Sequence, residues 1–178
     1  MGNLLNKAGP SPREVIEEAE QIFFEAMLTD DRHWGSKDDV WRVVKNLVFG
    51  TYGHSAAFVA MFRNGRPFWQ MHCQGYWEDQ ALPILSKALL KNYQQRIFRG
   101  GRGPGRFEQR VADGTMLYQN INDIGQKRED LTLFDNFRGE ETVTHLRHDD
   151  QGRFASGEYR TPLGSGRYQG MRLFQFDE

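Results

Sequence analysis

The chain has 178 residues and a formal net charge of -1, from 23 lysines and arginines against 24 aspartates and glutamates. This near balance excludes a global field that would attract nucleic acid or an anionic membrane, so such binding would need a local basic patch. The length suits one domain, because two halves of this size would each have only a thin core. We therefore expect a single domain over residues 11–178.

The composition provides both a core and a strongly polar surface. Apolar residues make up 38% of the chain and aromatic residues 13%, while the mean hydropathy is -0.71. Cys73 is the only cysteine, which excludes an intramolecular disulfide and a cysteine-cluster metal site and is typical of a reducing compartment. No stretch approaches the roughly 18 apolar residues of a membrane span, so we expect a soluble protein of the cytoplasm.

The N-terminal end predicts an arm followed by a helix. Residues 1–10 mix Gly, Asn and Pro without periodicity and are expected to form a flexible arm. Ser11 and Glu14 have the spacing of a capping box, and Pro12 occupies the first helical position, so a helix is predicted to run to Met27. Its apolar residues at helical spacing are Val15, Ala19, Ile22, Phe23 and Ala26.

Residues 40–73 predict strands. The apolar spacing over 40–52 fits a helix as well as strands broken at Lys45-Asn46, and we favour strands for the density of β-branched residues. The run AAFVAMF, the turn RNGR and the run PFWQMHC then predict a β-hairpin, since Asn64 and Gly65 tolerate the positive φ that such a turn requires.

The second half predicts one more helix and several strands. Apolar residues recur at helical spacing over 79–92, with Pro83 in the first turn. The stretch RGGRGPGRF indicates a loop, and TMLYQN, LTLFDNF, ETVTHLR, RFASGEYR and YQGMRLFQF indicate short strands. We therefore predict an α+β fold, with two main helices packed on a mostly antiparallel sheet of about seven or eight strands.

Two segments resemble each other weakly and suggest a duplicated hairpin. FVAMFRNGRPFWQMHCQG and FRGEETVTHLRHDDQGRFASGEYR each read as a strand, a glycine-containing turn and an aromatic-bearing strand. The alternative is that these are two unrelated hairpins with the features that hairpins share.

Five segments together resemble the bacterial family called domain of unknown function 5680: RNGRPFWQMHCQG, the helix with SKALL, the RGGRGP loop, DGTMLYQN and LFDNFRGEETV. The resemblance covers roughly residues 47–145. It implies sensing or binding rather than catalysis, because members of the family look like stand-alone proteins or domains attached to helix-turn-helix regulators. This chain departs from the family pattern at two places. The family has tyrosines before the glycine where this chain has His72, Cys73 and Gln74, and it has an acidic pair where this chain has Val59 and Ala60.

Alternation along the 66–73 strand suggests a ligand site. It places Trp69, Met71 and Cys73 on one face, as expected for a core. The other face has an aromatic ring, an amide and an imidazole, a mixture that suits a ligand pocket or a half-solvated sheet face. These three side chains are Phe68, Gln70 and His72.

The glycine-rich loop contains the local basic patch, formed by Arg96, Arg99, Arg102, Arg106 and Arg110. Guanidinium groups on such a loop could bind phosphate or carboxylate, although a solvated loop has the same composition. One short RGG-like copy in a neutral chain gives little support to RNA binding. Glu140 and Glu141 are adjacent on a predicted strand, so one should face inward and pair with Arg99 or Arg102.

No metal or known catalytic pattern emerges. The histidines lack metal-ligand spacing, and residues 149–152 are predicted to form a turn rather than a calcium loop. Cys73 and His72 point to opposite faces of a strand, so Cys73 is interpreted as a small buried hydrophobe. We expect no cofactor and no metal.

Three functions follow, in order of preference. The first is a binding module for a small anionic ligand or a peptide, with its site between the Gln70 and His72 face and the arginine loop. The second is a protein-interaction or inhibitor protein, as in defence or counter-defence, that uses exposed aromatics: Phe134, Phe137 and Tyr159. The third is a hydrolase that pairs His72 with Glu140 or Glu141. The candidate ligand-binding residues are Phe68, Gln70, His72, Arg99, Arg102, Arg106, Tyr118, Glu140 and Glu141.

Overall fold

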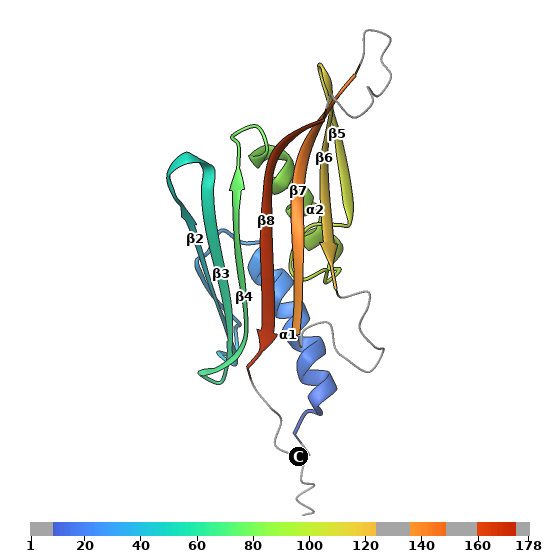
Figure 1. Cartoon of the computed structure of the whole chain (residues 1–178). Coiled ribbons are helices and arrows are strands. Elements are labelled where there is room, and N and C mark those ends of the chain that lie inside the picture. Colours follow the sequence, from blue (N-terminus) through green and yellow to red (C-terminus); the bar gives the residue numbers. More distant parts are fainter. Residues whose placement is uncertain (1–8, 124–135, 149–159, 174–178) are drawn as a thin grey trace, which may run out of the picture.

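The computed structural model describes residues 9–123, 136–148 and 160–173 (Figure 1). In these residues an eight-stranded antiparallel sheet is covered on one side by two helices, which confirms the predicted α+β fold. We call the helix side the covered face and the other side the open face. The elements are α1 (Pro12–Met27), β1 (His33–Gly35), β2 (Trp41–Phe49), β3 (His54–Arg63), β4 (Arg66–Trp77), α2 (Leu82–Gln95), β5 (Arg106–Val111), β6 (Gly114–Asn122), β7 (Asn136–Arg147) and β8 (Arg160–Arg172).

Local signals place the first helix and the first hairpin correctly. Ser11 and Glu14 form the predicted capping box at the start of α1, which ends at Met27. Asn64 and Gly65 connect β3 to β4 with φ values of 49° and 75°. The ambiguous 40–52 segment is mainly the strand β2, and a short 3-10 turn follows it at Thr51–Gly53.

The other predicted elements fit in part. The second helix runs over 82–95 instead of 79–92, and the TMLYQN and ETVTHLR segments lie in β6 and β7. Most of the predicted LTLFDNF and RFASGEYR strands falls outside the described residues, as do residues 1–8 of the predicted arm. Neither α1 nor α2, the helices of the described chain, has the length and apolar character that crossing a bilayer requires.

The covered face contains the core. Phe23 of α1 packs edge-on against Trp69 of β4 and Tyr93 of α2, with ring centroids 5.5 and 6.1 Å apart. A second cluster, which includes Leu85 and Tyr118, lies between α2 and the strands of the second half. Burial of these large side chains is the main stabilising term of the fold.

The order of the strands shows that the two halves of the chain have the same arrangement. The sheet runs β1-β2-β3-β4-β8-β7-β6-β5, so each half of the chain is a helix followed by four strands, and the halves meet where β4 pairs with β8. The first of the two similar segments is the β3–β4 hairpin, and the FRGEETVTHLR part of the second lies in β7, which holds the place equivalent to β3. Most of its RFASGEYR strand lies outside the described residues. Aligning RPFWQMHCQG of β4 with TPLGSGRYQG of β8 makes Cys73 equivalent to Tyr168. These two residues also face each other across the β4–β8 pair, as a pseudo-two-fold axis at that point requires.

The equivalent β3–β4 and β7–β8 pairs share a β-bulge, and this bulge corrects one prediction. In β3–β4 the register passes from Phe62 opposite Pro67 to Met61 opposite Trp69, which leaves Phe68 as the extra residue. Leu163, which follows Pro162, is the extra residue in β7–β8. Simple alternation placed Phe68 beside Gln70 and His72 on the open face, and this was wrong. The bulge breaks the period of two, and Phe68 is buried in the core with its ring 5.0 Å from that of Trp41.

Candidate functional site

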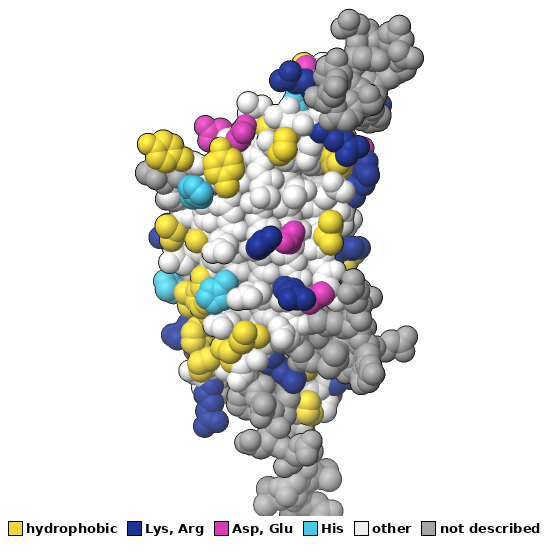
Figure 2. Space-filling view, viewed as in Figure 1, with side chains coloured by type: hydrophobic (Ala, Val, Ile, Leu, Met, Phe, Trp, Pro, Cys, Tyr) yellow, Lys and Arg dark blue, Asp and Glu magenta, His cyan; other side chains and the backbone are white. Residues whose placement is uncertain are grey.

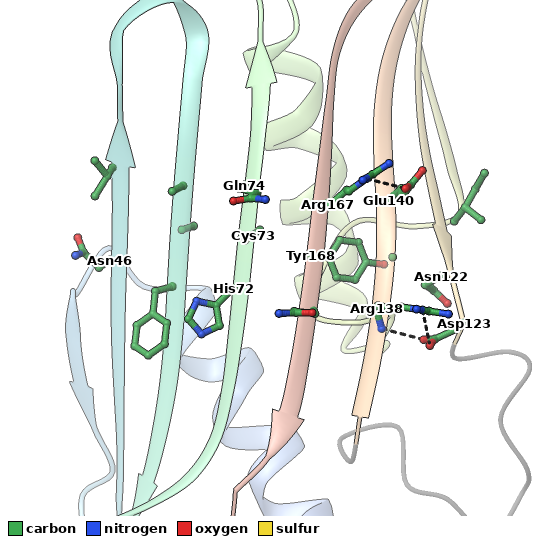
Figure 3. A pocket seen from close by; sticks show the side chains of 17 residues that line it. Asn46, His72, Cys73, Gln74, Asn122, Asp123, Arg138, Glu140, Arg167 and Tyr168 are labelled. Carbon is green, nitrogen blue, oxygen red and sulfur yellow. Dashed lines mark hydrogen bonds and ion pairs between the residues drawn. The ribbon is translucent and has the colours of Figure 1, made fainter.

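The open face contains a hollow of about 940 Å³ at its centre, over the strands β2, β3, β4, β8, β7 and β6 (Figure 3). We call it the central hollow. It is of the size of sites that bind small molecules. Its lining includes the side chains of Asn46, Phe58, His72, Gln74, Asp123, Arg138, Glu140, Arg167 and Gln169.

The register arranges these side chains in two rows that cross the strands. The first row is Asn46, Phe58, His72, Gln169 and Arg138, on β2, β3, β4, β8 and β7. Adjacent strands lie about 4.8 Å apart, so this row spans roughly 19 Å. The Phe58 and His72 rings are in contact, with centroids 4.8 Å apart. The row therefore passes from a ring pair at one side to a guanidinium at the other.

The second row runs parallel to the first and is more strongly polar in the middle. It consists of Val48, Ala56, Gln74, Arg167 and Glu140. The small side chain of Ala56, the second residue of this row, leaves room beside the Phe58 ring. Figure 2 shows hydrophobic side chains gathered over β2 and β3, and charged side chains in the middle of the face. The hollow thus has an apolar side and an ionic side.

Two ion pairs supply the charges of the hollow, and the distance between their charged atoms differs. Arg167 Nε lies 2.8 Å from Glu140 Oε1, whereas Arg138 Nε lies 3.8 Å from Asp123 Oδ2. The side chain of Arg138 is 84% exposed, and exposed pairs of this kind contribute little to stability. The Arg138 guanidinium can therefore exchange partners at little cost.

Four amide residues line the hollow, and all of them except Asn122 are exposed: Asn46, Gln74 and Gln169. Within the described part of the chain these three form no hydrogen bond or ion pair with another protein group. Each amide offers two donors and one acceptor oxygen to a bound molecule.

The predicted inward glutamate lies on the opposite side of the sheet. Glu141 points into the covered face, where Arg102 donates to both of its oxygens and Tyr118 donates to Oε2 at 2.9 Å. This confirms the prediction that one of the two adjacent glutamates is buried against Arg99 or Arg102. We call these groups, with Cys73 at 3.6 Å from the guanidinium, the buried network.

Electrostatics in the buried network follow from desolvation and from the ion pair. Burial alone would lower the pKa of Arg102, but the Glu141 carboxylate outweighs it and raises that pKa well above its usual value. Burial raises the pKa of Tyr118 strongly, and the neighbouring Glu141 charge adds to this effect. The pKa of the Cys73 thiol is also raised by burial, which is partly offset by Arg102. The guanidinium is thus charged, and the phenol and thiol are neutral, at physiological pH.

The network fixes the 99–105 loop to the sheet. Tyr118 accepts a hydrogen bond from the backbone N–H of Gly103 at 3.0 Å, and Asn120 donates to the Gly103 carbonyl at 2.7 Å. Asn92 of α2 donates to the Arg102 carbonyl at 2.6 Å. The loop is therefore held by buried bonds from β6 and α2, and three of its glycines, Gly100, Gly101 and Gly103, lie against aromatic rings with no room for a side chain.

The structure does not form the pocket predicted between His72 and the arginine loop. His72 and Gln70 lie on the open face, while Arg102 is buried on the covered face with Tyr118 and Glu141.

Arg99 is an exposed loop residue, and Arg106 pairs with Glu108 on the edge strand β5. Only His72 and Glu140 of the predicted set line the central hollow, with Gln70 one row beyond it. His72 and Glu140 do not form an acid-base pair, because β8 lies between their strands and separates them by roughly 10 Å. Phe137, expected to be exposed, is buried with 1% of its surface accessible, and Phe134 and Tyr159 lie outside the described residues.

Sequence reasoning missed the β8 and β7 side of the hollow. Arg167 and Gln169 alternate with the buried Tyr168, so the period of two in YQGMR and its flanks marks them as a polar face. Gln74 follows His72 at the same spacing. The pairing of β4 with β8 is the step that sequence alone does not supply.

Among the described residues, no group of three or more His, Cys, Asp and Glu side chains is placed to hold a metal ion. No protein-family model, curated protein or solved structure matches this chain. The geometry of the central hollow is therefore the basis for inferring a function.

Proposed function

We propose that this protein is a binding module that holds a small anionic ligand or a short peptide in the central hollow. The observation that carries the proposal is the hollow itself, on a sheet face that the two described helices leave open. Binding sites combine an apolar lining with a few polar groups that orient the ligand, and this hollow has both. The resemblance to a family associated with regulators agrees with a sensing role.

The anionic character of the ligand follows from the accessible cations. Arg138 has a distant partner and is largely exposed, so a ligand carboxylate or phosphate can replace Asp123 with a bidentate hydrogen bond. Gln74 and Gln169 provide uncharged donors beside it. A dianionic ligand gains less, because Glu140 and Asp123 also border the hollow.

A thermal-shift screen with anionic metabolites, nucleotides and short peptides tests this function. A ligand at a hundred times its dissociation constant should stabilise the protein by about 2.7 kcal/mol. Gln169→Trp should abolish the shift by filling the hollow. Ser86→Trp on the exposed side of α2 is the matched control and should retain the shift. A shift that survives Gln169→Trp would locate binding elsewhere and contradict the proposal.

A second function, protein interaction, is favoured by a different observation. Exposed apolar side chains lie near the turn between β2 and β3, where Tyr52 is 89% exposed and Leu47 and Val48, which point to opposite faces of the sheet, are 52% and 54% exposed. Exposed apolar side chains are common at protein interfaces. If this function holds, Tyr52→Ser with Leu47→Ser abolishes capture of a partner from the native host, while Gln169→Trp leaves capture unchanged.

A further inference from the structure

The two halves of the central hollow come from equivalent strands, and their differences give the hollow a direction. Gln74 of β4 and Gln169 of β8 are equivalent residues on either side of the pseudo-two-fold axis. Phe58, which pairs with His72, is equivalent to Glu140, which pairs with Arg167. The two halves therefore share the amides at the centre and differ in the residues beyond them.

A second pair of equivalent residues adds to this difference between the two halves. Ala56 pairs with Gln74 in the first half, and its counterpart in the second half is Arg138, which pairs with Gln169. The first half thus presents a ring and a methyl group where the second half presents a carboxylate and a guanidinium. A ligand that spans the axis meets an apolar surface at one end and Arg138 at the other.

The spacing of the strands sets the length of such a ligand. From Phe58 on β3 to Arg138 on β7 there are three inter-strand steps, or roughly 14 Å. Between them stand His72 and Gln169, and the Gln74 amide is one row away. The middle of the ligand therefore meets groups that both donate and accept hydrogen bonds.

Building on the proposed function, we infer that the central hollow binds amphiphiles of the N-acyl amino acid type. The acyl chain lies over Phe58 and Ala56, the amide of the ligand bonds to Gln74 and Gln169, and the carboxylate binds Arg138. The carboxylate takes the place of Asp123, because the ion pair of Asp123 with Arg138, at 3.8 Å, is the longer of the two ion pairs in the hollow.

The test uses two probes that differ only in charge, N-decanoylglycine and its neutral amide, N-decanoylglycinamide, below their aggregation concentrations. Titration is followed by calorimetry and by backbone amide NMR. The acid should bind about tenfold or more tightly than the amide, as a charge-assisted hydrogen bond implies. Both probes should shift the signals of Gln74 and Gln169.

Matched variants assign the two ends. Arg138→Gln should remove the preference, so that acid and amide bind with about equal affinity. Arg66→Gln, at the exposed start of β4, should leave the preference unchanged. Phe58→Ala should weaken both probes equally. The fold of each variant is checked by its NMR spectrum. If Arg138→Gln does not fold, Arg138→Lys takes its place and should keep a reduced preference.

The outcomes separate this inference from the function on which it rests. Equal affinity for acid and amide at the hollow, or a preference that survives Arg138→Gln, overturns the inference and leaves the hollow a binding site. If neither probe shifts Gln74 or Gln169 while a compound from the screen does, the inference also fails and the proposed function stands. If no compound of any kind shifts these signals, both fail.

Discussion

The Arg102 guanidinium pairs with the buried Glu141 carboxylate on the covered face, while the preceding residue, Glu140, faces the central hollow. The Arg102 Nε atom lies 3.1 Å from Glu141 Oε2, and the Tyr118 hydroxyl donates to the same oxygen. One step along β7 thus separates a structural carboxylate from one that borders the candidate site. The two can be tested independently.

Glu141→Gln should destabilise the protein by about 3–5 kcal/mol, because it leaves the Arg102 charge buried without a counter-ion. The double variant Arg102→Met with Glu141→Val should recover much of this loss, since the equivalent residue of the first half, Val59, is a buried apolar side chain. Urea denaturation measures both changes.

The matched control for this prediction is Arg106→Gln. Arg106 pairs with Glu108 on the surface, where both side chains are well exposed, so the variant should lose less than about 1 kcal/mol. A cost for Glu141→Gln as small as that of Arg106→Gln would show that the buried pair does not stabilise the loop.

Gly103→Ala should destabilise the protein by about 1–3 kcal/mol, because its Cβ would lie 2.6 Å from the buried ring of Tyr118. Gly105→Ala in the same loop is the control: its Cβ would meet no heavy atom closer than 3.9 Å. Thermal unfolding of the two variants under identical conditions measures the difference. Equal melting temperatures would contradict the close packing of the loop on β6.

Stability should fall at alkaline pH. Burial raises the pKa of Tyr168 to about 12 and that of Tyr118 further, so both phenols stay neutral in the folded protein where the unfolded chain has ionised them. Unfolding then releases protons, and the stability that these groups contribute below pH 10 is lost as the pH rises from about 10 to 12.

Melting temperatures measured between pH 8 and about 11.5 check this prediction. Tyr118→Phe should be less stable at neutral pH and should show a weaker alkaline decline. Tyr52→Phe, at an exposed position, should decline like the wild type. A decline that is the same in all three proteins would assign the effect to other groups.

Cys73 should react slowly with iodoacetamide in the native protein. The thiol is buried beside Arg102, and burial raises its pKa, so both access and the thiolate fraction are low. We expect a rate about a hundredfold below that in urea, measured by mass spectrometry. Ser86→Cys in a Cys73→Ala background provides an exposed thiol that should react at once with or without urea.

Sequence predicted the elements whose signals are local. The capping box at Ser11 and the Asn64-Gly65 turn specify their structures within a few residues, and both are present. Phe68 was misplaced because a bulge depends on the pairing partner, which the strand alone does not encode.

The candidate site was predicted only in part for the same reason. His72 and Gln169 become neighbours through the pairing of β4 with β8, strands from opposite halves of the chain. The arginine loop was interpreted as a ligand-binding element, but the buried Glu141 carboxylate determines where Arg102 lies. Arginine content does not distinguish a cation that binds a ligand from one that closes a core.

The seam between β4 and β8 also protects a sheet edge. A single helix-and-four-strand unit would leave the backbone groups of β4 unpaired along one edge, with Trp69 and Met71 beside them. Two copies joined edge to edge about a two-fold axis would pair these backbone groups and cover these side chains. The β4–β8 pairing, with Cys73 opposite Tyr168, does this here. The residues between Trp77 and Leu82 join the two units in one polypeptide, so the two sides of the shared sheet differ in sequence, which the identical chains of a homodimer cannot do.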